Sequence, residues 1–228
     1  TLPENNMNCN CLMTNNTKLW DGVCETDPSA TKPFLRPGGF KGTGVDPMYL
    51  IQKATSVWGP MGDAWGAKEV QTILEGGAVY MKVQVYYPSS SNKEELAIVE
   101  QWGGTNMYRK PKDGVQEADD EAFKKSFTDG LSKCLSYLGF SADVHMGRFD
   151  DSKYIDALSA KYDEEKSKAR VIKQLPAMEE ALAAVETKDG LAIWECMSEK
   201  FMDVCKLRVP DYHEELLHRY LEKKEELE

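Results

Sequence analysis

The chain has 228 residues, of which 41% are hydrophobic, so it can bury the core of one moderate domain together with a smaller unit. Its formal net charge of −10 at pH 7 argues against a simple duplex-DNA-binding protein, because such proteins are usually basic. The sequence has no apolar run long enough to span a membrane and no apolar leader, so we expect a cytoplasmic protein.

The acidic residues lie mostly outside the middle of the chain. Residues 155–228 hold 18 acidic and 12 basic residues, a net charge of −6, and residues 1–30 carry a net charge of −3. Residues 31–154 carry a net charge of only −1. The middle segment therefore remains open to a polyanionic partner despite the acidic total.

Residues 1–30 are rich in Asn and Thr and predict a polar, flexible tail. The tail holds Cys9, Cys11 and Cys24, but a C-x-C pair lacks the C-x-x-C spacing and second ligand pair of most zinc sites. A metal site there is the less favoured alternative to a cysteine-bearing tail without metal. Cys134, which lies further along the chain beside apolar residues, is expected to be a reduced, semi-buried thiol.

Residues 31–45 read as a Pro/Gly loop in which basic and aromatic residues alternate. A helix follows, because Asp46 can cap it and Pro47 suits its first position, and Gly59-Pro60 ends it. Three strands come next, over residues 65–74, 78–87 and 96–102. The second strand alternates strictly, and Gly76-Gly77 before it and Gly103-Gly104 after the third predict turns.

The stretch from Phe123 to Met146 predicts an amphipathic helix. Its apolar stripe is expected to consist of Phe123, Phe127, Leu131, Leu135 and Leu138. Lysines and hydroxyl groups lie off that stripe, where they could hold a phosphate backbone, although a core helix with a solvated face is the simpler interpretation. The order predicts an α+β fold, with an antiparallel meander packed on this long helix, a β-β-β-α core.

Residues 155–173 predict a charged helical connector, because apolar residues are few. Pro176 is expected to open a separate helical segment, so residues 174–228 predict a small all-α C-terminal domain. Residues 31–154 form the candidate functional core.

Catalytic signatures are absent from the sequence. The glycines of residues 38–44 do not have phosphate-loop spacing, no zinc-protease or nucleophile-elbow motif occurs, and the three histidines are scattered. We therefore predict a protein that is not an enzyme and that needs no cofactor or metal.

The sequence does contain residues that are typical of binding sites. Single-strand binders combine cations that follow the phosphate backbone with planar groups that contact bases. Two loops interleave both types, the first with Lys32, Phe34, Arg36, Phe40 and Lys41, the second with Tyr108, Arg109, Lys110 and Lys112. Ordinary soluble loops with hydrophobic anchors are an equally weighted interpretation of these residues.

Three segments occur in a characteristic order: GGFKGTGVDPMYLIQKATSVWGPMGDAW (residues 38–65), the helix that contains Thr128-Asp129-Gly130 and ends at Gly139, and ADVHMGRFDDSKY (residues 142–154). Together they resemble single-strand annealing proteins of the Sak type in the Rad-fifty-two-like superfamily. The resemblance covers residues 31–154, a little over half of the chain. It implies a ring or helical oligomer that holds single-stranded DNA in a basic groove with its bases outward.

Carried over residue by residue, the resemblance implies that Lys133 contacts DNA, with Lys124 and Lys125 upstream on the same helix. Ser132 stands where a second basic residue is common in the family, which implies either weaker binding or a groove completed by Arg36, Lys41 or Lys53. Lys32, Arg109 and Lys110 are further DNA-binding candidates. Thr128, Asp129, Gly130 and Gly139 would set helix geometry and neighbour contacts.

The sequence thus predicts ATP-independent binding and annealing of single-stranded DNA in phage recombination, in the bacterial cytoplasm. The C-terminal domain could dock a phage exonuclease or a host single-strand-binding protein. The alternatives are an oligomeric scaffold whose helical tail recruits partners, and a single-strand-binding protein without annealing activity.

Overall fold

The computed structural model describes residues 16–35, 38–39, 41–90, 92, 94–109 and 116–228. The chain divides into two units, Thr1–Ser152 and Lys153–Glu228. Each unit has a hydrophobic core of its own.

An antiparallel sheet forms the first unit's centre. It consists of β3 (Gly66–Glu75), β4 (Ala78–Pro88) and β5 (Leu96–Asn106), in the order β3-β4-β5. Val79, Met81, Val83 and Val85 are buried along one face of β4, as the alternating pattern predicted. Gly76 and Gly77 make the β3–β4 turn with positive φ angles of 59° and 76°, which favour glycine.

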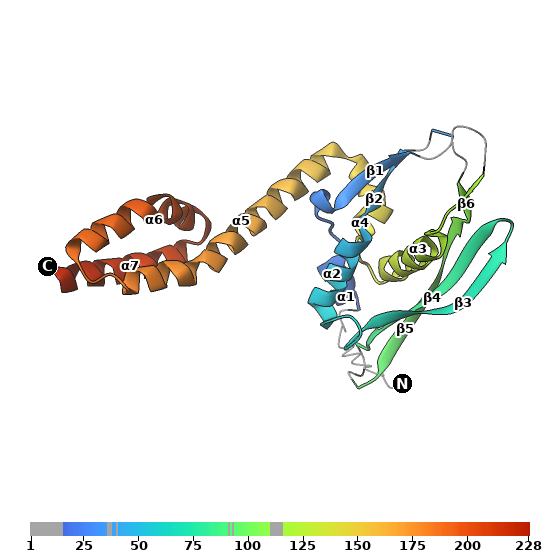
Figure 1. Ribbon diagram of the computed structural model, residues 1–228, viewed down its shortest axis with the longest axis horizontal. Coiled ribbons are helices and arrows are strands. Elements are labelled where there is room, and N and C mark those ends of the chain that lie inside the picture. Colours follow the sequence, from blue (N-terminus) through green and yellow to red (C-terminus); the bar gives the residue numbers. More distant parts are fainter. Residues whose placement is uncertain (1–15, 36–37, 40, 91, 93, 110–115) are drawn as a thin grey trace, which may run out of the picture. The chain divides into compact units, whose positions relative to one another are not determined.

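Helix α3 (Ala122–Tyr137) packs across β4 and β5, and this arrangement confirms the predicted α+β fold (Figure 1). The predicted apolar stripe is partly wrong, because Phe123 is 48% exposed. The helix turns a face of small and polar residues toward the sheet instead, including Ser126, Gly130 and Cys134, all of which are buried.

The close approach of α3 to β5 explains this face. A β-carbon on Gly103 would collide with the Ser126 carbonyl oxygen and the Gly130 nitrogen, and would lie 2.9 Å from the Gly130 Cα. A β-carbon on Gly130 would lie 2.6 Å from a Val83 methyl group. The expected end of the third strand at Gly103-Gly104 is therefore wrong, since β5 continues to Asn106 and Gly103 serves as the contact point.

Helix α3 ends at Tyr137, earlier than predicted, in a Schellman motif. Gly139 has φ +98°, its N–H donates to the Ser136 carbonyl oxygen, and the Phe140 N–H donates to the Leu135 carbonyl oxygen. Two short helical turns follow, α4 (Ala142–His145) and η2 (Arg148–Asp150).

The predicted tail is wrong for residues 18–30, which fold against the core. They form α1 (Lys18–Val23) and η1 (Pro28–Ala30), and Val23 is buried in the core. Thr26 is also buried, and its N–H and Oγ donate to the Asp143 carboxylate at 2.8 Å and 2.5 Å. The pair of cysteines at positions 9 and 11 lies outside the described residues.

The predicted loop at 31–45 is also wrong, because its ends form a hairpin. Strands β1 (Thr31–Leu35) and β2 (Lys41–Val45) pair from Thr31 opposite Val45 to Leu35 opposite Lys41. Helix α2 (Pro47–Trp58) follows with its predicted cap, since the Asp46 carboxylate accepts from the Met48 N–H at 2.8 Å. Two short strands, β6 (Tyr108–Arg109) and β7 (Glu117–Ala118), pair before α3.

The second unit contains α5 (Ser152–Ala183), α6 (Lys188–Arg208) and α7 (Pro210–Leu227). The predicted break at Pro176 is wrong, because Pro176 lies inside α5. Val171, Leu175, Met178 and Leu182 recur at helical spacing on both sides of it and join one core. This packing offsets the helix-breaking tendency of proline. No helix in the described parts of the chain is apolar enough over a sufficient length to cross a membrane.

The Gly103–Gly130 contact generates a stability prediction. Gly103→Ala should lower the free energy of unfolding of the first unit by at least about 2 kcal/mol, because the added methyl group meets backbone atoms that cannot move aside. Urea unfolding followed by near-UV circular dichroism measures this change. Gly22→Ala is the matched control, since its β-carbon would have no atom within 4 Å; equal losses in both variants would contradict the prediction.

Candidate nucleic-acid interface

A groove of about 750 Å³ lies between the β1–β2 hairpin and the C-terminal half of α3. Residues from α1, β1, β2, α2, α3 and α4 line it. Its aromatic residues are Trp20, Phe34 and Tyr137, and its polar residues on α3 are Asp129, Ser132, Lys133 and Ser136. The groove thus combines planar side chains with a cation, the combination that single-strand binders use.

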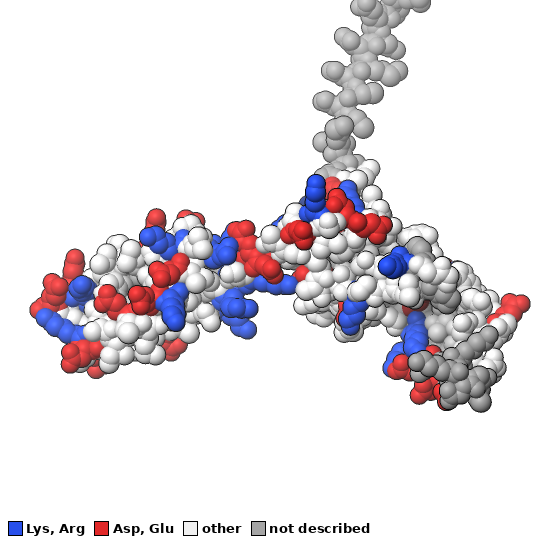
Figure 2. Space-filling model, turned by 90° about the horizontal axis from the view of Figure 1, so that it is seen from above, with Lys and Arg blue, Asp and Glu red and all other residues white. Residues whose placement is uncertain are grey.

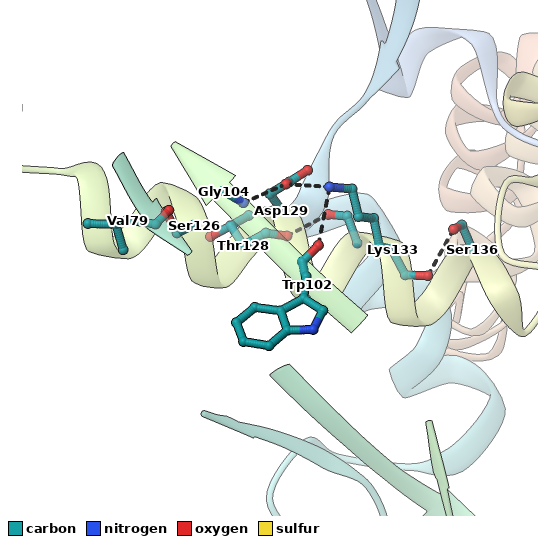
Figure 3. Close-up of polar contacts among 9 residues, drawn as sticks. Val79, Trp102, Gly104, Ser126, Thr128, Asp129, Lys133 and Ser136 are labelled. Atoms are coloured by element: carbon teal, nitrogen blue, oxygen red, sulfur yellow. Dashed lines mark hydrogen bonds and ion pairs between the residues drawn. The ribbon is translucent and has the colours of Figure 1, made fainter. Parts of the chain in front are cut away.

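Lys133 is held at the groove by two contacts (Figure 3). Its Nζ lies 2.7 Å from Asp129 Oδ2 and donates to the Trp102 carbonyl oxygen at 3.2 Å. The side chain is nonetheless 48% exposed. An ammonium group has three donors, so one N–H of Lys133 remains for a ligand in this arrangement.

Asp129 connects α3 to β5. Its Oδ2 accepts from the Gly104 N–H at 3.0 Å as well as from Lys133. Trp102 and Gly104 are two residues apart on β5, so their outward C=O and N–H point the same way. The Asp129–Lys133 pair therefore satisfies one C=O and one N–H of this strand, which pairs with β4 alone among the described strands.

The two serine hydroxyl groups of α3 that line the groove bond within the helix. Ser132 Oγ donates to the Thr128 carbonyl oxygen at 2.8 Å, and Ser136 Oγ donates to the Lys133 carbonyl oxygen at 2.9 Å. Their protons are therefore engaged in the free protein, and the expectation that they offer donors to phosphate requires these local bonds to open.

His145 also lines the groove. Partial desolvation of the ring lowers its pKa, although the residue is exposed and the nearby Asp143 carboxylate acts in the opposite direction. His145 is therefore predominantly neutral at pH 7. Among the described residues that line the groove, Lys133 supplies the full positive charge.

The other two predicted lysines of α3 lie elsewhere. Lys124 precedes Lys133 by nine residues, which places the two on opposite sides of an α-helix. Its Nζ lies 2.9 Å from Glu121 Oε1. Lys125 lines a second hollow of about 630 Å³ and pairs with Asp119 at 2.7 Å. The structure does not bring either lysine to the groove.

The predicted cations outside α3 are also divided. Lys53 donates to the Glu25 carbonyl oxygen and lies 5.6 Å from the centre of the Tyr49 ring, so it holds the N-terminal segment in place. Lys32 and Lys41 are exposed on the hairpin. Strand alternation places Lys32 on the same face as Phe34, which lines the groove. Arg36 and Lys110 lie outside the described residues, and Arg109 is described only as backbone in β6.

The signature residues serve the contacts around the groove. Asp129 and Gly130 join α3 to β5, and Thr128 Oγ donates to the Lys124 carbonyl oxygen at 2.8 Å. A β-carbon on Gly139 would lie 2.9 Å from Trp20 atoms, so this glycine lets α1 approach the end of α3. Sequence reasoning missed Trp20 and Tyr137; a tryptophan inside a supposed polar tail was the available signal.

No three His, Cys, Asp or Glu side chains gather into a possible metal site within the described ranges. Figure 2 shows acidic and basic side chains interleaved over the C-terminal unit. Comparison of the chain with known protein families and with curated protein sequences gave no match.

Cys134 lies on the sheet-facing side of α3 and generates a prediction about reactivity. Its Sγ donates to the Val83 carbonyl oxygen at 3.3 Å and to the Val99 carbonyl oxygen at 3.6 Å, and burial raises the pKa of the thiol to about 11. Because the thiolate is the nucleophile, alkylation of native Cys134 at pH 8 should be at least about a hundredfold slower than that of a free, exposed thiol.

Peptide mapping by mass spectrometry after timed iodoacetamide treatment measures this difference. Exposed Cys196 is the internal reference, and both cysteines should react at similar rates in denaturant. Equal labelling of the two residues in the native protein would contradict the burial of Cys134.

Proposed function

We propose that this protein binds single-stranded DNA and anneals complementary strands without ATP, as an oligomeric ring or helix in phage recombination. The observation that carries the proposal is the groove beside α3, where Lys133 lies among Trp20, Phe34 and Tyr137. Lys133 is also the residue that best matches the family's DNA-contacting position in the resemblance.

The chemistry of the groove suits a strand held by its backbone. A lysine contacts phosphate as a point charge and reads no base sequence, so any strand is accepted. Aromatic side chains can stack on sugars or bases of any identity. Sequence choice is then left to base pairing with the second strand, which requires no nucleotide hydrolysis.

The two edge strands of the sheet support the proposed assembly of several copies of the chain. Strands β3 and β5 each pair with β4 alone among the described strands, so both are edges of the sheet. Unpaired edges favour association with another chain, and a head-to-tail contact between copies produces a ring or a filament.

The two α3 lysines on opposite sides of the helix provide the test. Lys133→Gln should weaken binding of a labelled single-stranded oligonucleotide by about tenfold, because a phosphate contact is lost in every subunit. Lys124→Gln removes the same charge outside the groove and should weaken binding by less than about twofold. Fluorescence anisotropy across a salt series measures both affinities.

Annealing of two complementary labelled oligonucleotides without ATP is measured with the same proteins. The wild-type chain should accelerate annealing at low salt, and the acceleration should fade as salt rises. No acceleration at any salt would contradict the annealing function. Equal effects of the two lysine variants would show that the groove is not the binding site.

One observation favours the alternative of an oligomeric scaffold. Ile193, Met197, Val204 and Leu207 recur along one side of α6 and are all exposed, and Met197 is 81% exposed. Leu191, Trp194 and Cys205 face the core of this unit from another side of the same helix. The exposed stripe covers about 21 Å of helix, a length that suits packing against the same stripe of a second copy.

The scaffold alternative predicts that the stripe contributes to self-association. Met197→Glu should then lower the solution mass of the full chain by sedimentation, because a charge would be buried at the contact. Ala192→Glu introduces the same charge on another exposed side of α6 and should leave the mass unchanged. An unchanged mass in both variants, together with active annealing, would eliminate the scaffold alternative.

A further inference from the structure

The cation of the groove is paired within its own helix. Lys133 Nζ lies 2.7 Å from Asp129 Oδ2, one turn earlier on α3. Both side chains are nearly half exposed, at 48% and 40%. An exposed ion pair at this spacing contributes little to stability, so the pairing with Lys133 is not explained by stability alone.

Asp129 cannot swing away freely, because the sheet also holds it. Its Oδ2 accepts from the Gly104 N–H at 3.0 Å, and Lys133 is held in turn by the Trp102 carbonyl oxygen at 3.2 Å (Figure 3). A phosphate that binds the third donor of Lys133 must therefore approach a carboxylate whose position is set by β5. The negative charges of the phosphate and of the Asp129 carboxylate repel each other. The same carboxylate already neutralises part of the positive charge of Lys133.

We infer that Asp129 is a positioning residue that both orients Lys133 toward the groove and competes with phosphate for it. The inference rests on the proposed function and deepens it by assigning a control on strand release. The competition weakens each phosphate contact, so a bound strand dissociates faster than the lysine alone would allow. Fast release benefits annealing, because a strand must shift its register until it finds its complement.

The test uses single substitutions and one double substitution in the full chain. Asp129→Asn keeps an acceptor for the Gly104 N–H and removes the charge, so affinity for single-stranded DNA should increase about threefold to tenfold, with a slower dissociation rate. Glu121→Gln is the matched control, because it also removes one negative charge, at the N-cap of α3, and releases Lys124, outside the groove. Its effect on affinity should be less than about twofold.

A double variant separates competition from net charge. In a Lys133→Gln background, Asp129→Asn should raise affinity by less than about twofold, because the contact for which the carboxylate competes is gone and only its direct repulsion of the strand remains. The affinities come from fluorescence anisotropy, and the dissociation rates from chase experiments with unlabelled oligonucleotide. Asp129→Ser, which also removes the charge, repeats the measurement if the Asn variant fails to fold.

The outcomes distinguish the inference from the function beneath it. If Lys133→Gln weakens binding but Asp129→Asn does not tighten it, Asp129 does not compete with phosphate for Lys133. The inference is then wrong, and the proposed DNA site stands. If Asp129→Asn and Glu121→Gln tighten binding equally, the effect is one of net charge and the inference fails. If Lys133→Gln has no effect on binding, the proposed DNA site itself fails.

Discussion

The first unit depends on the contact between two backbones at Gly103 and Gly130. A helix and a strand can approach this closely only where neither carries a β-carbon, and the collisions that a methyl group would meet at Gly103 are with backbone atoms. The contact sets the position of α3 on the sheet. It also explains why the face of α3 that is turned to the sheet holds Ser126 and Cys134 rather than a run of leucines.

The groove follows from that position. Because α3 lies so close to β5, Asp129 and Lys133 reach the N–H of Gly104 and the C=O of Trp102. Just after the C-terminal end of α3, Gly139 lets Trp20 approach and line the groove. Three glycines, one on β5, one on α3 and one just after α3, thus determine where a cation and an aromatic side chain meet, although none of the three has a side chain to contribute.

The charge of the chain and the charge of the groove are separate properties. The protein is acidic as a whole, and each α3 lysine has a carboxylate neighbour within salt-bridge distance. If the protein binds single-stranded DNA as proposed, a groove built in this way would hold the polyanion weakly at each subunit, and strong binding would have to come from repetition around the proposed oligomer. The proposed annealing activity is consistent with such weak, repeated contacts, which release a strand readily.

The sequence by itself determined the α+β class, the strand alternation of β4 and the capped start of α2, because periodicity and capping are local patterns. The role of Lys133 in DNA binding, which the family resemblance implies, stays a prediction. The sequence did not reveal the hairpin at residues 31–45, the continuous helix through Pro176 or the folded segment at 18–30. Pairing and packing with distant residues decide those features against local preference. Only the tertiary structure separated Lys133 from Lys124 and Lys125 and joined it to Trp20 and Asp129, because helix rotation and the close approach of α3 to β5 decide which side chains share a groove.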